Sequence, residues 1–271
     1  MKTPTMLWRE IQEFPVKPRT VVLWWLYQAG FVLKSPGGSI ILVDPYLSDA
    51  VRRSYKIPRN APATLDAAEV AADAILATHS HEDHLDPDSI VAFSNHEKTV
   101  FIGPPMVTTK LASVGVTPDK TLTIERGASV PVGDFAIRAV YARHLFGLEP
   151  TPDAIGFVIE CGGVTIYHSG DTEYDSEIVN DTRGVTAALI SINGTTGNMN
   201  AQEAAMLAWR QEALLAVPMH YGLWRNEDYG EGATLEPSIF VDTYHRLKPD
   251  GQTLILEAAH AVVLNSDGDV A

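Results

Sequence analysis

The segment of this chain with the clearest chemistry is 79–84, which reads His-Ser-His-Glu-Asp-His. Three neighbouring imidazoles repel one another when they are protonated, and without a metal they are hard to satisfy when they are neutral. The apolar run at 74–77 precedes the cluster, which indicates a strand that delivers these side chains into a loop. The pattern therefore predicts a divalent metal site.

The spacing within the cluster favours two ions over one. Alternate side chains of an extended segment point the same way, so His79 and His81 can bind one ion. After a turn, Asp83 and His84 face a second direction and can bind another. Imidazole suits zinc, iron or manganese, and carboxylates shift the preference toward harder ions. A two-metal site needs more ligands than these four, so others must come from elsewhere in the chain.

Three residues farther along the chain can complete the site. His144, Asp171 and His220 each come shortly after a predicted strand. A lone histidine at a strand end is more often a surface or hydrogen-bonded residue. Together with the cluster, however, they make a set of five histidines and two aspartates. Asp171, which has two carboxylate oxygens, is the natural bridge between two ions.

The elements that must position these residues alternate between strands and helices. Strands are predicted at 21–27, 30–34, 39–43, 74–78, 100–103, 121–125, 135–141, 155–161, 164–168, 187–192, 214–218, 253–257 and 261–264. Helices are predicted at 65–72, 86–93, 106–114, 201–211 (with Asn200 as N-cap) and 237–247, and a basic surface loop at 48–63. No linker divides the two β-rich halves. We therefore predict a four-layer αββα sandwich, of the α/β class, in one domain spanning residues 1–271.

Composition narrows the function further. The formal net charge is −14, which disfavours nucleic acid and anionic membranes as partners, although bound divalent ions leave an anionic small substrate possible. Cys161 is the only cysteine, so no intrachain disulfide forms, and we expect a half-buried thiol there. Residues 1–18 lack the apolar core of a signal peptide, and no apolar run approaches the roughly 20 residues of a membrane span. We expect a cytoplasmic enzyme.

The motif at 78–84, with Asp44 before it and His144, the Ser-Gly-Asp at 169–171 and His220 after it, resembles the metallo-β-lactamase superfamily. The order and spacing match from about Leu23 onward. The resemblance implies that Asp44 orients the ligand loop and that Asp171 bridges two metals. It implies that one metal is held by His79, His81 and His144, and the other by Asp83, His84 and His220.

The sequence around these motifs is similar to that of the ascorbate-6-phosphate lactonase branch of the superfamily, for example at 24–26, 101–104, 167–171 and 220–224. That branch implies hydrolysis of a phosphorylated sugar-acid lactone, usually with manganese. This chain lacks insertions of that branch before the histidine cluster and before residue 155. Since such insertions shape the substrate pocket, the substrate of that branch is not assigned to this chain. His144 also stands where we expect an acidic residue in the lactonase, which bears on the preferred metal.

The site predicts a mechanism. Two divalent ions (manganese or zinc rather than iron) share a water, lower its pKa and so supply a bridging hydroxide that attacks an acyl or phosphoryl centre. The ions stabilise the oxyanion, and Asp83 or Asp171 accepts or relays the proton. We predict a hydrolase that opens a lactone or cleaves a related ester of a small molecule, with or without a phosphate group.

Three alternatives remain beside that prediction. The first is a phosphodiesterase of the same superfamily, acting on a cyclic nucleotide or another small phosphodiester. The second is an oxidoreductase related to flavodiiron proteins, which favour a carboxylate where this chain has His81. The third is a structural metal site, but such sites are typically closed by four ligands, and seven imply open positions for water.

Substrate contacts are less well marked than metal ligands. His168, beside the bridging aspartate, is a candidate to orient a ligand or contact substrate, with a purely structural role equally open. Gln28, Asn193 and Tyr221 lie on loops after strands and are candidates to bind substrate. Arg52 and Arg53, with Lys56, are candidates to receive a phosphate, although a solvated basic loop is the favoured interpretation. The expected partner is a small-molecule substrate, and assembly into a homo-oligomer stays open.

Overall fold

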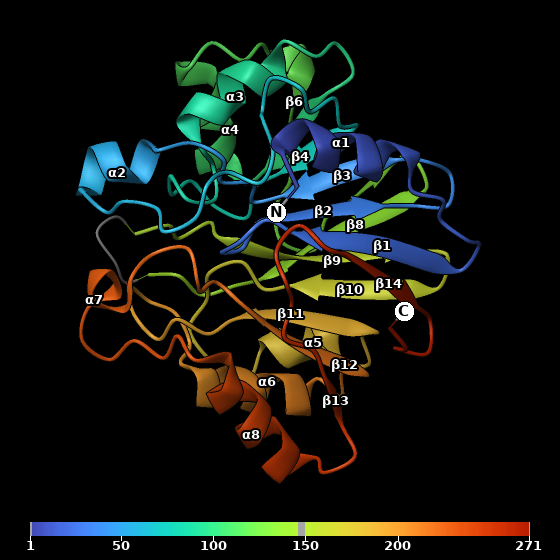
Figure 1. The fold of residues 1–271 in the computed structure, drawn as a ribbon, viewed down its shortest axis with the longest axis vertical. Helices are drawn as coiled ribbons and strands as arrows, with labels where there is room; N and C mark the ends of the chain where they lie inside the picture. The colour runs from blue at the N-terminus through green and yellow to red at the C-terminus, as the bar shows by residue number, and fades with distance from the viewer. Residues whose placement is uncertain (1, 146–149, 271) are drawn as a thin grey trace.

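Two mixed sheets stack face to face, and helices cover the outer face of each (Figure 1). The computed structural model describes residues 2–145 and 150–270. The predicted domain range therefore includes positions 1, 146–149 and 271, which lie outside the described residues. The four layers confirm the αββα sandwich that was predicted from the alternation of strands and helices.

The first sheet has seven strands, antiparallel on one side and parallel on the other. Their order is β14 (Ala261–Asn265), β1 (Thr20–Trp25), β2 (Phe31–Lys34), β3 (Ile40–Val43), β4 (Ala74–Leu76), β5 (Val100–Gly103) and β6 (Thr121–Thr123). Leu23 and Trp25 of β1 pack between the sheets, whereas Val22 and Trp24 pack under the outer helices. Because both faces are buried, the strand reads as a continuous apolar run. The outer helices are α1 (Pro4–Glu13), α3 (Pro87–Ser94) and α4 (Pro105–Ser113). The 3-10 turn η1 (Pro118–Lys120) follows α4 and leads into β6.

The second sheet repeats this plan. Its order is β13 (Gln252–Thr253), β12 (Leu215–Met219), β11 (Ala187–Ser191), β10 (Val164–His168), β9 (Ile155–Cys161), β8 (Phe135–Tyr141) and β7 (Ser129–Val132). Its outer face carries α5 (Ile178–Thr182), α6 (Ala201–Arg210) and α8 (Pro237–Leu247). The predicted N-cap is confirmed, because the Asn200 side chain accepts from the Glu203 amide and the Glu203 side chain accepts from the Asn200 amide.

Strands β3 and β4 run parallel to each other, as do β10, β11 and β12. The carboxyl ends of parallel strands meet at one edge of a sheet, so the loops that follow them gather at one end of the sandwich. Two short helices lie at the left of Figure 1, α2 (Ala50–Tyr55) at the upper left and α7 (Asn226–Tyr229) below it. None of the helices within the described ranges is both long and apolar enough to cross a membrane.

Several sequence-based boundaries are wrong. The predicted helix at 65–72 is instead a turn flanked by irregular backbone, in which the Asp66 carboxylate accepts from the Ala68 amide. A side chain that bonds its own backbone in this way competes with helix formation. The predicted loop at 48–63 contains α2, whose buried face was too short to be recognised. The predicted strand at 253–257 is reduced to β13, because the chain leaves the sheet after the Leu254 amide bonds to Ala216.

The N-terminal segment also forms a helix that was not predicted. Thr3 accepts from the Met6 amide as N-cap of α1, and Pro4 fits its first turn. At the far end of β9, Cys161 is buried rather than half-buried as expected, and burial raises the pKa of its thiol to about 11. A thiol so rarely ionised at neutral pH is a poor nucleophile.

Candidate metal centre

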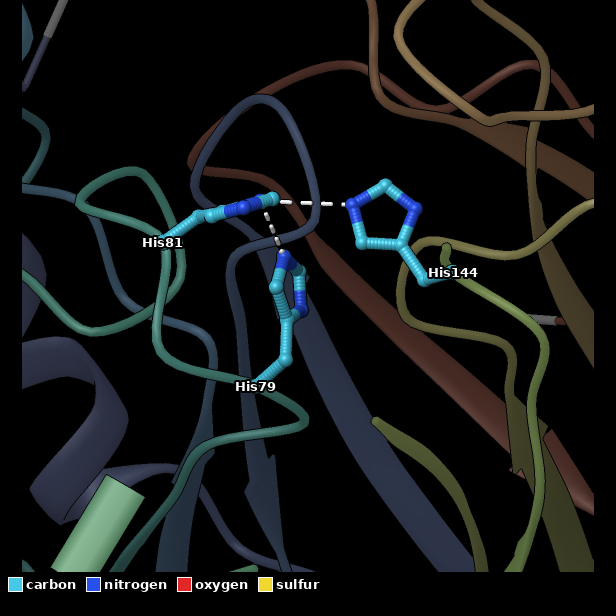
Figure 2. Close-up of side chains that lie close together, drawn as sticks. All are labelled: His79, His81 and His144. Carbon is cyan, nitrogen blue, oxygen red and sulfur yellow. Dashed lines mark hydrogen bonds between the residues drawn. The ribbon is translucent and has the colours of Figure 1, made fainter. Parts of the chain in front are cut away.

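The first donor cluster consists of three imidazoles from two loops. His79 and His81 follow β4, and His144 follows β8. The Nδ1 atom of His81 lies 2.9 Å from Nε2 of His79 and 3.2 Å from Nε2 of His144. Figure 2 shows the rings of His79 and His144 pointing toward that of His81. Three ring nitrogens that converge so closely can share one cation.

The second cluster stands beside the first and combines two imidazoles with a carboxylate. Nε2 of His84 lies 3.2 Å from Nε2 of His220, which follows β12. Oδ2 of Asp83 lies 3.3 Å from the same His220 nitrogen and 3.6 Å from that of His84. These three donors can likewise hold one cation.

Asp171 lies between the two clusters. Its Oδ1 is 3.3 Å from Nε2 of His84 and 3.2 Å from Nε2 of His220. Its Oδ2 faces the other way and lies 3.9 Å from Nε2 of His144. One carboxylate oxygen therefore serves each cluster, which is the arrangement expected of a bridging ligand.

The outward-facing nitrogen of four of these rings is held by the protein, which leaves the inner nitrogen directed at the centre. The partners are Thr78 Oγ1 for His79 (3.1 Å), Asp44 Oδ2 for His84 (2.7 Å), Gly197 O for His144 (3.1 Å) and the Gln28 amide for His220 (3.2 Å). Metal-binding histidines are typically oriented by such contacts to their second nitrogen. The donor set and its supports therefore fit two divalent ions.

Asp44 fastens the start of the ligand loop, as predicted for an orienting carboxylate. It is fully buried and accepts from the Thr78 amide at 2.8 Å and the Thr78 hydroxyl at 2.7 Å, besides its contact with His84. Asp86, which was not predicted to act here, fastens the other end of the loop. It accepts from the amides of Leu47 and Ser48.

Electrostatics distinguish the two clusters in the metal-free protein. Burial lowers the pKa of His79 and of His144, so both stay neutral and keep a lone pair for a cation. Burial also lowers the pKa of His84, but Asp171 and its other carboxylate neighbours outweigh that effect and raise it well above the usual value. The carboxylates around the second cluster thus favour positive charge beside His84, which a divalent ion can supply in place of the proton.

Two further buried residues, His168 and Gln28, support the ligands rather than bind a metal themselves. His168 is fully buried and its Nε2 lies 2.8 Å from the carbonyl oxygen of Ala29, while its Nδ1 accepts from the Gly170 amide. It therefore ties the turn that carries Asp171 to the β1–β2 loop, in keeping with an orienting role. Gln28 was proposed as a substrate contact, but it is fully buried between His220 and the Tyr229 hydroxyl, which donates to its Oε1 at 2.8 Å.

A pocket of about 290 Å³ opens beside the clusters, and His81, Asp83, Asp171 and His220 form part of its lining. Of the candidate substrate contacts, Asn193 lines this pocket. Within the described residues its Oδ1 has no hydrogen-bond partner, although the side chain is buried. Burial with one free acceptor makes it a suitable contact for a polar substrate group.

The other candidates lie outside the lining of the pocket. Tyr221 is buried against Trp25, with ring centroids 5.1 Å apart. Arg53 is exposed and its Nη1 pairs with Asp88 at 2.6 Å. Arg52 lies 3.9 Å from Asp49. Both arginine side chains of α2 face solvent outside the pocket lining, so a phosphate contact from these arginines stays a prediction.

Sequence reasoning missed the residues that form the far wall of the pocket. Trp224 and Tyr229 come from the segment after His220, and Val51, Tyr55 and Ile57 come from α2 and its end. The one available signal was the aromatic character of 221–229, directly after a predicted ligand.

Comparison with known proteins agrees with this geometry. Residues 40–221, more than half of the chain, match the model of the Beta-lactamase superfamily domain. The chain therefore belongs to the metallo-β-lactamase superfamily of metal-dependent hydrolases.

Among curated proteins, the chain is 26% identical to the probable L-ascorbate-6-phosphate lactonase UlaG of Escherichia coli O127:H6, over 80% of this chain and 74% of the relative. Among solved structures, Igni18, a novel metallo hydrolase from the archaeon Ignicoccus hospitalis, superposes with a TM-score of 0.67 at 20% identity, covering 91% of this chain and 99% of its own. CmlA, a diiron β-hydroxylase from Streptomyces venezuelae, gives a TM-score of 0.66 at 16% identity over 92% of this chain and 55% of its own. A fold shared by a hydrolase and a hydroxylase shows the architecture alone, so the reaction must be argued from the site.

Proposed function

We propose that this protein hydrolyses a lactone or a related carboxylic ester of a small molecule with the help of two divalent ions, manganese or zinc. The observation that carries the proposal is the position of Asp171, whose two oxygens face separate donor clusters. When bound there, two divalent ions activate water and polarise a scissile carbonyl. A pocket of about 290 Å³ suits a small molecule better than a polymer.

The chain's own residues divide the remaining work. Asp83 has the more exposed side chain of the two carboxylates, at 17% against 5% for Asp171, and it lines the pocket. Burial would raise the pKa of Asp83, but His84 and His220 outweigh it and lower the pKa to about 2, so the group is anionic at neutral pH. We propose that Asp83 accepts a proton during turnover and that Asp171 keeps the two donor clusters in position. Asn193 is assigned a hydrogen bond to the substrate.

The test is metal analysis combined with a hydrolase screen. Purified protein is loaded with manganese or zinc, its metal content is measured, and lactones, phosphodiesters and amides are offered in parallel. We expect close to two ions per chain and turnover of a lactone or ester that a chelator abolishes. Turnover of phosphodiesters alone would favour the phosphodiesterase alternative and overturn the proposal.

A histidine substitution provides the matched comparison. His81→Ala removes a donor of the first cluster, so hydrolysis and metal content should both fall. His245→Ala removes an exposed histidine of α8 that is no part of the pocket lining, and both quantities should be retained. Equal activity in the two variants would contradict the assignment.

A further inference from the structure

We infer that the substituent next to the scissile group of the substrate is uncharged and apolar and carries no phosphate. This inference rests on the proposed ester or lactone hydrolysis and names the class of substrate that the site accepts. It differs from the substrate in the name of the Escherichia coli relative, which is a phosphate ester. The argument comes from the pocket wall opposite the metal ligands.

The apolar part of that wall is a small hydrophobic cluster of its own. Val51 packs there with Tyr46 and Trp224, separately from the two large cores of the sandwich. The Trp224 ring lies 6.0 Å from that of Tyr46 and 5.6 Å from that of Tyr229, measured between centroids. Partly buried Ile57 completes the surface offered to a ligand. Aliphatic and aromatic side chains held in this way bind an apolar group by removing both surfaces from water.

The charged residues of the lining are acidic. Beyond the metal ligands, the pocket is lined by Glu82 and Asp228, and none of its described lining residues is an arginine or a lysine. Glu82 accepts from the Ser54 hydroxyl with one oxygen, and its other oxygen is buried without a hydrogen-bond partner in the described part of the chain. A phosphate dianion placed here would face this carboxylate with no cation from the protein to balance it.

The cations on and around the wall lie outside the pocket lining and have other partners; beside Ile57, for example, the Lys56 ammonium donates to the Arg53 carbonyl oxygen at 2.8 Å. Arg225 pairs with Asp228 through Nε at 2.9 Å and lies 3.3 Å from Glu227. Arg59 lies outside the pocket lining and donates to the carbonyl oxygens of Ser48 and Ala61 through Nη1 and Nε, while its Nη2 is buried without a hydrogen-bond partner in the described residues. Phosphate sites in proteins depend on free arginine or lysine side chains or on a helix N-terminus, and α2 is too short to provide the latter. The wall is therefore built for an uncharged group.

A matched set of γ-lactones tests the inference. The ring is kept constant and one ring carbon carries a short alkyl chain, a phosphomethyl group or a trimethylammonium group. For the metal-loaded enzyme we expect kcat/KM for the alkyl lactone to exceed that for either charged lactone by about tenfold or more. A higher value for the phosphate or the ammonium compound would overturn the inference but leave the hydrolase proposal standing. If none of the three is opened while another class is, the proposed function itself is wrong.

Binding without turnover gives a second readout. Cyclic ethers with the same three substituents cannot be hydrolysed, and calorimetric titration measures their affinity directly. The alkyl ether should bind most tightly. Glu82→Gln removes the charge but preserves the shape of the side chain, so it should narrow the preference for alkyl over phosphate. Trp224→Ala should raise the KM and weaken alkyl binding by about tenfold. Unchanged ratios in both variants would show that this wall does not contact the substituent.

Discussion

The two sides of the pocket are built in different ways. The metal side takes its donors from loops that follow β4, β8, β10 and β12, and hydrogen bonds to partners such as buried Asp44 orient four of the five imidazole rings. The opposite wall belongs to neither sheet. It is held together where Val51 of α2 packs with Tyr46 and Trp224, and where the Trp224 ring contacts those of Tyr46 and Tyr229. The strand ends therefore set the positions of the metal ligands. The choice of substrate is set by the wall of α2 and the 223–229 segment, which can vary without moving those ligands.

The two sides of the pocket also differ in which free energy a substitution changes. On the metal side, a lost partner leaves a buried polar group unsatisfied, which costs about 1–3 kcal/mol for each group. On the wall side, truncation of a side chain mainly loses contact area, and its cost falls on binding. Substitutions on the metal side should therefore reduce stability and metal binding, whereas substitutions on the wall should mainly reduce substrate binding.

The largest effect is expected at Asp171. Asp171→Asn replaces one of the two bridging oxygens by an amide that cannot accept, so the ions lose their shared ligand. We expect hydrolysis to fall by about 10³-fold or more and the metal content to drop below that of the parent protein. Enzyme kinetics with elemental analysis measure both quantities.

The control for this substitution is Asp242→Asn, an exposed aspartate on α8. It makes the same chemical change far from the pocket lining and should leave both quantities as they are. If Asp171→Asn behaved like this control, the assignment of a bridging ligand would be lost.

The next largest effect is expected at Asp44. Asp44→Ala leaves the buried donors of Thr78 and the outward-facing Nδ1 of His84 without their acceptor. We expect a loss of about 2–4 kcal/mol in unfolding free energy and a weakening of metal binding by about 10–100-fold. Urea unfolding of the metal-free protein and competition with a chelator measure the two effects.

Asp44→Asn is the matched comparison, because it keeps one acceptor oxygen and because asparagine tolerates the positive φ of 45° at this position. Its losses should be smaller on both measures. Equal stability of the parent and the alanine variant would show that the carboxylate does not support the loop.

Much of the metal side could be predicted from sequence because its signal is local. His79, His81 and His84 stand in one short run, and each remaining ligand comes shortly after an apolar strand. The sandwich followed from the alternation of strands and helices. The role of Gln28 was not predictable, since its partners are 192 and 201 positions away along the chain. Nothing near Gln28 in the sequence indicates either contact.

The wall was not predictable for a different physical reason. Helix α2 has six residues, of which Ala50 and Val51 are buried, so no periodic pattern could develop against the basic residues around it. Trp224 and Ile57 face each other only after two distant loops have folded. Similarly, local bonding by Asp66 overrode the helical composition of 65–72. Such short segments depend on tertiary contacts, which propensity does not record.

A smaller effect, still on the metal side, is expected at Gln28. Gln28→Leu keeps the volume but removes the contact with Nδ1 of His220, so the ring loses its orientation. We expect affinity for the ion at the cluster of Asp83, His84 and His220 to fall by about tenfold, with little change at the other cluster. Stepwise metal titration resolves the two.

Tyr229→Phe serves as the graded comparison, since it removes the hydroxyl that holds Gln28 but leaves the amide itself. Its effect on metal affinity should be smaller than that of Gln28→Leu. A larger effect from the tyrosine would mean that Tyr229 supports the ions by a route other than the Gln28 amide.

The smallest effect is expected at Arg53, which tests where the wall ends. Its guanidinium is exposed and paired with Asp88 on α3, and exposed pairs of this kind contribute little. Arg53→Ala should leave kcat/KM within about twofold for the alkyl lactone and for the phosphate lactone alike. A loss confined to the phosphate compound would place a phosphate contact on α2. That result would contradict the apolar wall, because a substrate reaching Arg53 would have to lie across the outer face of the helix that carries Val51.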